Sequence, residues 1–241
     1  MRFLLLSMMM PLSFAPRILA FDTSTVRGSV ALLEGSKMQA EFRLQSVQTH
    51  SRQLLNSVDF LLGRIGWNLG DVNLVSVGNG PGSFTGIRIG IATALGIAHS
   101  LSIPFVEISG LDALAHKVCH LDGRIGAVMD AHRSQAFYGE YEAKNGRIRQ
   151  TQKPVLLDIS SLEHHLRGRH LYLVGDPDIC ESVGSPATSL TWPRQVAVDL
   201  FLAVEIGKLA FISRRKWRSG ESIAAEPMYI RPPDALKKKT Q

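Results

Sequence analysis

The chain has 241 residues, of which 45% are hydrophobic and 20% are charged, and its formal net charge at pH 7 is +6. This composition excludes a disordered or collagen-like chain and suits one large domain or two small lobes. Two cysteines, Cys119 and Cys180, show no C-x-x-C spacing, which excludes a disulfide framework and favours a reducing compartment.

The first sixteen residues, MRFLLLSMMMPLSFAP, differ from those that follow. They contain one arginine, an apolar run and a small residue, Ala15, where a signal peptide would be cleaved, but the run is too short to span a bilayer. RILAFDTST follows at once with the pattern of a buried strand. We interpret residues 1–16 as a disordered leader, or as the result of a start codon placed ahead of Met8, Met9 or Met10.

Most of the net positive charge lies at the C-terminus. Residues 214–241 contain eight Lys or Arg and three acidic residues, a net charge of +5, which leaves about +1 for the rest. Such a tail can contact nucleic-acid phosphates, although a run of charges is more often a solvated segment. We therefore treat residues 214–241 as a basic tail outside the folded body.

The first half of the chain alternates strands and helices in the order βββαβαβ. Leucine and valine recur at helical spacing in residues 51–65, and Gly66 ends that pattern. Strands are predicted over residues 18–24, 28–34, 38–45, 72–78 and 103–109, and helices over residues 51–65 and 83–98.

The second half repeats this order with little residue identity. RIGAVMDA and AFYGEYEA predict two strands, an Asn145-Gly146 turn leads to a third, and ISSLEHHLR, LYLVG and a helix around VAVDLFLAVEIGKLAFISR follow. An aspartate ends each opening strand, Asp22 and Asp130. The two halves therefore share an order of strands and helices but not a repeated sequence.

We predict an α/β fold of two lobes with duplicated βββαβα order, residues 17–109 and 110–213. This is the pattern of the actin, Hsp70 and sugar-kinase (ASKHA) superfamily, in which the two strand-end aspartates face a cleft that holds ATP and its metal.

One hypothesis is accordingly an ATP-dependent phosphotransferase. The turn Asp22-Thr23-Ser24-Thr25 offers hard oxygen ligands of the kind that Mg²⁺ prefers. The matching hairpin of the second lobe, DAHRSQAF, has no glycine to let the backbone approach a phosphate, and LYLVGDPD has one glycine where an adenosine pocket needs a pair. Half of the nucleotide site is thus missing.

The glycine-rich stretch VSVGNGPGSFTGIRIG is only in part like a phosphate loop. Gly80, Gly82 and Ser83 offer backbone amides at a helix start, where anions bind. The lysine of a P-loop is missing, however, and the spacing G-x-G-x-x-x-G departs from the dinucleotide fingerprint. This stretch is interpreted mainly as a tight turn that begins a helix.

A metal hydrolase is the second enzymatic alternative. His116 and His120 in HKVCH have ligand spacing on a predicted helix, beside Cys119. No glutamate follows His116, as the H-E-x-x-H motif requires, and no third ligand can be named. Surface histidines are the simpler interpretation.

The helix predicted over 83–98 is apolar on every side, with Arg88 as its one charge. A helix that is apolar all round is buried all round, and a single sheet covers one face. Together with helix 51–65 it predicts an apolar ridge that binds a partner chain. A stripe of small residues at i+4 steps is expected to let a second helix approach closely: Gly86, Gly90, Ala94 and Ala98.

Several segments together carry a specific resemblance. FDTST, THSRQLL, GNGPGSFTGIRIGIATALGIA, VMDAHRSQAFYGEYE, LVGD and EPMYIRP, in this order from residue 17 almost to the end, resemble the TsaB (YeaZ) family of the Gcp-like superfamily. The resemblance implies a cytoplasmic bacterial protein that is the non-catalytic partner of the transferase TsaD. With the ATPase TsaE, that complex forms N6-threonylcarbamoyladenosine at position 37 of tRNAs that read ANN codons.

The resemblance implies no catalytic residues and no bound metal in this chain. The H-x-x-x-H motif of the catalytic relative would fall near Ile108 and Asp112, where there is no histidine, and the family's DAR is Asp130-Ala131-His132 here. ATP and metal would be used by the partner subunits. Any weak nucleotide affinity of this chain would rest on Asp22, Thr23, Ser24 and Gly82.

The resemblance further implies a homodimer when the protein is alone, contact with tRNA only through the complex, and no membrane. The family's dimer surface is built from its first two helices. The matching residues here are Ser51, Leu54, Leu55, Val58, Phe84, Ile87, Ile91 and Ala94.

Overall fold

The computed structural model describes residues 15–45, 51–183, 193–213, 228 and 230. This part of the chain divides into two compact units. The first lobe contains the described residues up to 110 and those of 201–213, and the second lobe contains the described residues of 111–200. The predicted leader and basic tail fall almost entirely outside the described residues.

The first lobe is built on a mixed sheet of five strands in the order β3-β2-β1-β4-β5. The central strand β1 pairs antiparallel with β2 and parallel with β4. Leu19 and Phe21 of β1 are fully buried, as an apolar central strand requires. The strands are β1 (Arg17–Asp22), β2 (Arg27–Glu34), β3 (Lys37–Gln45), β4 (Leu74–Gly78) and β5 (Phe105–Ile108).

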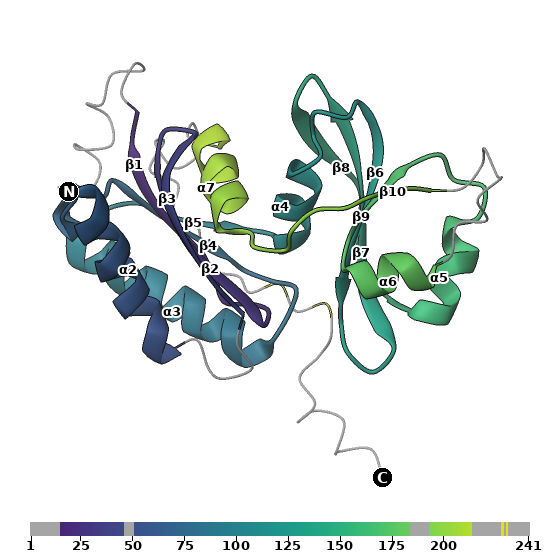
Figure 1. Ribbon diagram of the computed structural model, residues 1–241, viewed down its shortest axis with the longest axis horizontal. Helices are drawn as coiled ribbons and strands as arrows, with labels where there is room; N and C mark the ends of the chain where they lie inside the picture. Colours follow the sequence, from purple (N-terminus) through teal and green to yellow (C-terminus); the bar gives the residue numbers. More distant parts are fainter. Residues whose placement is uncertain (1–14, 46–50, 184–192, 214–227, 229, 231–241) are drawn as a thin grey trace, which may run out of the picture. The chain divides into compact units, whose positions relative to one another are not determined.

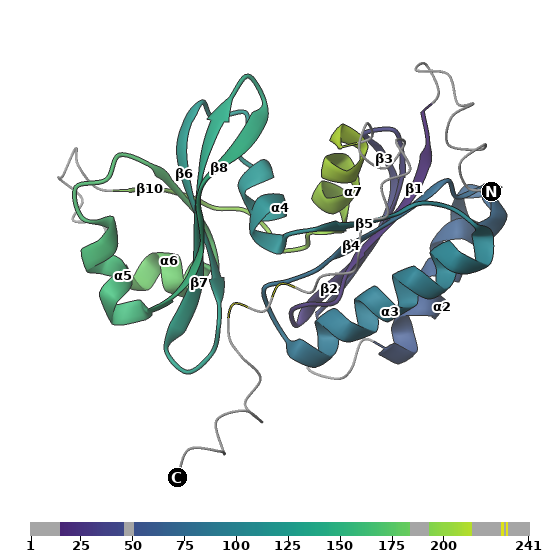
Figure 2. The ribbon, with the colours of Figure 1, turned by 180° about the vertical axis from the view of Figure 1, so that it is seen from behind.

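Helices cover both faces of this sheet. Figures 1 and 2 show α2 and α3 side by side on one face and α7 on the other. The helix after the glycine-rich turn begins where predicted, because the Ser83 side chain accepts a hydrogen bond from the Gly86 amide at 3.3 Å as its N-cap. The helical segments are α2 (Ser51–Ile65), the 3₁₀ turn η1 (Leu69–Asp71), α3 (Phe84–Leu101) and α7 (Ala203–Ile212).

The second lobe repeats the plan of the first. Its sheet order, β8-β7-β6-β9-β10, again places the opening strand in the centre, antiparallel to the second strand and parallel to the fourth. Asp22 and Asp130 end the two central strands. The predicted duplicated two-lobed α/β fold is confirmed. The elements are α4 (Gly110–His116), β6 (Gly123–Asp130), β7 (Gln135–Lys144), β8 (Arg147–Asp158), α5 (Ile159–Leu166), β9 (Tyr172–Gly175), α6 (Pro177–Ser182) and β10 (Arg194–Val196).

One predicted boundary is wrong, because α7 does not complete the second lobe. It packs on β1, β2 and β4 of the first sheet. Gly207 allows this close approach, since a Cβ there would lie 2.4 Å from a methyl carbon of Leu33. Ala203 and Ile206 are fully buried against the same sheet. The second lobe therefore ends near residue 200 and not at 213.

A cluster of charged and aromatic side chains surrounds a buried glutamate in the second lobe. Glu140 on β7 is 4% exposed and accepts hydrogen bonds from Tyr138 Oη at 2.9 Å and from Arg124 at 2.8 Å. Its carboxylate also contacts the guanidinium of Arg169, and His165 Nε2 lies 3.8 Å from it. We call these five residues the Glu140 cluster.

Two pKa values in the Glu140 cluster are displaced in the same direction. Burial raises the pKa of Glu140, but the hydrogen bonds from Tyr138 and Arg124 and the charges of both arginines outweigh it, so this pKa lies below its usual 4.5. Burial and the charge of Arg169 lower the pKa of His165 below 6.5. The cluster thus favours an ionised carboxylate beside a neutral imidazole.

We expect the second lobe to lose stability as the pH falls. A group whose pKa is depressed in the folded state stabilises the fold above its unfolded pKa and loses that contribution as the pH falls through the folded value. For His165 the loss begins below about 6.5, and for Glu140 below about 4.5. Thermal unfolding between pH 7.5 and 3 should show a falling midpoint.

The matched variant for this pH experiment is Glu140→Gln. At pH 7 it should cost about 3 kcal/mol, because it breaks a buried ion pair, and its stability should depend less on pH below 4.5. An identical pH profile in Glu140→Gln would show that another carboxylate causes the acid sensitivity.

Candidate functional site

The glycine-rich turn is in contact with the strand-end turn of the first lobe. Asp22 Oδ1 accepts a hydrogen bond from the Ser24 amide at 3.0 Å, and the Ser24 carbonyl accepts one from the Ser83 amide at 2.7 Å. Thr23 Oγ1 donates to the Gly86 carbonyl at 2.8 Å. The two turns are therefore bonded to each other at the start of α3.

The four residues predicted for weak nucleotide binding do lie together. Gly82 has a φ of 156°, and a Cβ there would stand 2.2 Å from the Ser24 carbonyl oxygen. Asp22, Thr23 and Ser24 are at most 2% exposed. A backbone carbonyl, not an anion, thus faces the amide of the N-cap residue, so the turn serves to begin α3 and to anchor it on β1. Nucleotide affinity itself stays a prediction.

The predicted role of the small-residue stripe on α3 is wrong for its two glycines. Gly86 and Gly90 do not face another helix. A Cβ on Gly86 would stand 2.1 Å from the Thr23 carbonyl oxygen, and one on Gly90 would stand 2.5 Å from Thr23 Oγ1. Both glycines let α3 lie directly against the turn that follows β1, within its own lobe.

Five of the eight predicted interface residues are core residues of the first lobe, which is a correction. They belong to the cluster that fills the space between the sheet and the two helices: Leu54, Val58, Ile87, Ile91 and Ala94. Helical spacing shows which residues share a face, but not which face meets the sheet. Leu55 is 52% exposed and Phe84 is half-buried, so these two remain at the surface. Ser51 lies in α2, but its side chain is outside the described part.

The outer face of α3 carries a row of exposed residues that the sequence interpretation missed. Its members follow one another at helical spacing: Arg88, Ala92, Leu95 and His99. Leu95 is 41% exposed, and the Arg88 guanidinium lies 3.7 Å from the centre of the Phe84 ring. Gly86 and Gly90 lie on the opposite face of α3. They were the sequence feature from which the buried face of the helix could have been predicted. α3 is not buried all round by its own chain.

By length and composition alone, α3 would pass as a membrane-spanning helix. In this fold, the apolar composition of α3 is explained by packing inside the first lobe. Seven of its residues, mostly apolar, are buried against the sheet or the adjoining turns, including Ile87, Ile91 and Ile97. The helix is a core helix with one exposed face.

The candidate helical pair of histidine ligands does not form, and the preferred interpretation of both histidines as surface residues is wrong for His116, which is buried. α4 ends at His116, which is 8% exposed, and His120 lies in the turn beyond the helix. The i, i+4 geometry that places two ligands on one helix face is therefore absent here. Within the described residues, no group of three His, Cys, Asp or Glu is arranged to hold a metal ion.

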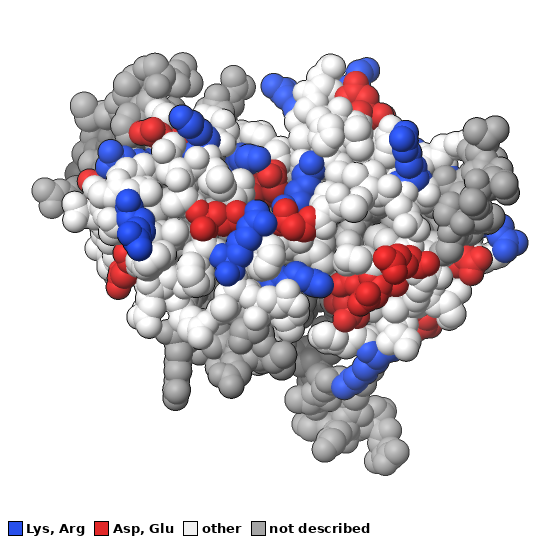
Figure 3. Space-filling view, viewed as in Figure 1, with Lys and Arg blue, Asp and Glu red and all other residues white. Residues whose placement is uncertain are grey.

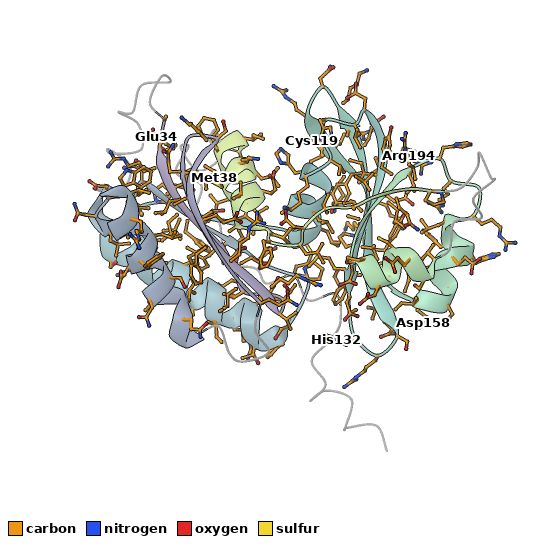
Figure 4. All side chains as sticks on the ribbon, viewed as in Figure 1. Glu34, Met38, Cys119, His132, Asp158 and Arg194 are labelled. Carbon is orange, nitrogen blue, oxygen red and sulfur yellow. The ribbon has the colours of Figure 1, made fainter. Side chains whose placement is uncertain are left out.

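In the second lobe, Asp130 organises an exposed hairpin turn. Its carboxylate accepts a hydrogen bond from the His132 amide at 2.7 Å and lies 3.0 Å from His132 Nδ1. His132, Arg133 and Ser134 all have φ between 56° and 58°, a left-handed conformation that costs non-glycine residues about 1 kcal/mol each. Figure 4 labels His132 at this turn.

Two α/β lobes of identical strand order are the architecture of the actin, Hsp70 and sugar-kinase class. Component A of (R)-2-hydroxyglutaryl-CoA dehydratase from Acidaminococcus fermentans shares this fold with a TM-score of 0.50 at 10% identity, over 84% of this chain and 100% of that one.

YeaZ from Pseudomonas aeruginosa is far more similar, with a TM-score of 0.71 and 27% identity over 89% of this chain and 99% of that one. Residues 44–178 match the family described as TsaD, tRNA N6-adenosine threonylcarbamoyltransferase. The tRNA threonylcarbamoyladenosine biosynthesis protein TsaB of Bacillus subtilis is 38% identical over 133 residues, 55% of this chain and 58% of that protein.

The match to the Bacillus protein thus spans little more than half of its length. TsaB of Buchnera aphidicola subsp. Schizaphis graminum is 32% identical over 164 residues, 66% of this chain and 78% of that protein. The chain belongs to the TsaB (YeaZ) family.

Proposed function

We propose that this protein is a non-catalytic subunit of the cytoplasmic machinery that forms N6-threonylcarbamoyladenosine at position 37 of tRNAs reading ANN codons. One observation carries the non-catalytic role. The turn that bears Asp22 is at most 2% exposed from Asp22 to Ser24 and is bonded to the chain's own glycine-rich turn. The relatives in Bacillus and Buchnera are tRNA threonylcarbamoyladenosine biosynthesis proteins, which supports the pathway.

The partner that we propose is a TsaD-like transferase, joined by a TsaE-like ATPase in the full complex. ATP and metal are used by those subunits, and this chain binds no cofactor tightly. Its association with tRNA is through the complex, and it forms a homodimer when the transferase is absent.

The surface that we propose for both kinds of association is the exposed side of α2 and α3. It carries Leu55 and Leu95, together with the half-buried ring of Phe84 under Arg88. Exposed apolar side chains on two adjacent helices are typical of protein interfaces. This assignment replaces the five core residues named from helical spacing.

Reconstitution tests the proposal. Formation of threonylcarbamoyladenosine on tRNA is measured with the transferase, the ATPase and the threonylcarbamoyl-adenylate synthase, with and without this protein. We expect strict dependence on the protein and no ATP turnover by the protein alone. Equal modification in its absence would overturn the scaffold role. ATP turnover that is lost in Asp22→Ala would favour the phosphotransferase alternative.

A further inference from the structure

The Glu140 cluster holds more hydrogen-bond donors than its carboxylate can accept. Glu140 accepts hydrogen bonds from Tyr138 and Arg124 and pairs with Arg169, so both carboxylate oxygens have partners. Each guanidinium has five N–H donors and uses few of them here. His165 Nε2 is buried and makes no hydrogen bond within the described part of the chain. One negative charge thus faces two permanent positive charges.

The two guanidinium groups are held in place and open to solvent at the same time. The side chain of Arg124 is 53% exposed and that of Arg169 is 31% exposed, whereas that of Glu140 is 5% exposed. They come from separate segments, β6 and the turn that joins α5 to β9, and both contact the carboxylate of Glu140. A buried carboxylate that orients two arginines lowers the entropy cost of binding a ligand.

The surroundings add cationic and aromatic groups, and one exposed carboxylate, Glu163, directly precedes the segment that carries them. The segment HHLRGRH exposes His164, Arg167 and His170 next to Arg169. Glu142, the next carboxylate on this face of β7, is bound to Arg149 at 2.7 Å. Figure 3 shows basic and acidic side chains on the face in view, with a group of acidic side chains on the second lobe, so a large basic field does not support RNA binding there and the local geometry must do so.

We propose that the Glu140 cluster binds phosphate groups of the RNA backbone, with Arg124 and Arg169 as the contacting residues and Glu140 as their positioning residue. Paired guanidinium forks match the oxygen geometry of a phosphate. Neighbouring histidine rings suit an RNA, whose unpaired bases stack on such rings. The choice of RNA as the ligand rests on the proposed function, because tRNA is the substrate of that pathway.

The test measures binding of an unmodified tRNA transcript with an ANN-reading anticodon to the full chain, by fluorescence anisotropy at several salt concentrations. Arg124→Gln and Arg169→Gln should each weaken binding roughly five- to tenfold near 0.1 M salt and reduce the salt slope by about 0.7 to 0.9. Arg124→Lys should retain most of the slope. Lys37→Gln is the control, because it removes an equal charge from an exposed position of the first lobe, and should change neither quantity.

Three other outcomes of these measurements would contradict the proposal. Equal effects of Arg124→Gln and Lys37→Gln would overturn it. A lower melting temperature in Arg124→Gln with unchanged tRNA affinity would also overturn it, because it would show that the cluster has a purely structural role. Binding of inorganic phosphate that depends on Arg124 while tRNA binding does not would assign a free anion instead of RNA. Since binding is measured without the transferase, failure here leaves the reconstitution result unaffected.

Discussion

Replacing Leu95 by glutamate is expected to abolish self-association and binding of the transferase while leaving the fold intact. Leu95 is 41% exposed on the outer row of α3, so the free protein tolerates a charge there within about 0.5 kcal/mol. At an apolar interface the same charge is desolvated without a partner, which should weaken association at least roughly tenfold, or about 1.4 kcal/mol. Sedimentation analysis and thermal unfolding separate the two effects.

The opposite result is expected one helical turn away on the core side. Ile91 is 6% exposed inside the first lobe, so Ile91→Glu buries an unpaired charge and should cost about 4 kcal/mol or more, which unfolds the lobe. Gln150→Glu, an exposed position on β8, adds the same charge to the second lobe as a control. Wild-type assembly by Leu95→Glu would place the interface elsewhere, and a well-folded Ile91→Glu would refute the assignment of faces.

Replacing Gly86 by alanine should destabilise the first lobe by about 3 kcal/mol. The added Cβ would stand 2.1 Å from the Thr23 carbonyl oxygen, and backbone cannot move aside as a flexible side chain does. Separation of the two turns would also strain the 2.8 Å hydrogen bond from Thr23 Oγ1 to the Gly86 carbonyl. The melting temperature should fall by about 2 to 4 °C for each kcal/mol.

Gly96→Ala on the same helix is the control with the opposite sign. No atom lies within 4 Å of a Cβ at Gly96, and alanine is the better helix former by about 0.5 to 1 kcal/mol. The free protein should therefore become slightly more stable. Equal effects at both glycines would show that the contact with the turn of Thr23 contributes nothing, and that helix propensity alone decides.

Local patterns predicted the order of elements in the first lobe, and the sequence motifs predicted the family, whereas α6 and β10 of the second lobe were not predicted. Alternation and helical spacing located α2 within its observed bounds, and Ser83 marked the start of α3. The two strand-end aspartates indicated the duplication, which the identical sheet orders bear out. These features are encoded in short windows, where side-chain periodicity and backbone capping act locally.

Which faces those elements bury depends on contacts between distant parts of the chain. Helical spacing placed Ile87, Ile91 and Leu95 along one side of α3, but the structure buries Ile87 and Ile91 and leaves Leu95 41% exposed. Close packing decides it, because Gly86 and Gly90 are the positions where the turn after β1 can approach the helix backbone. Gly207 likewise brings α7 onto Leu33 of the first sheet, across more than 170 residues of chain. Contacts between residues so distant in sequence depend on shape complementarity in three dimensions, which no local window contains.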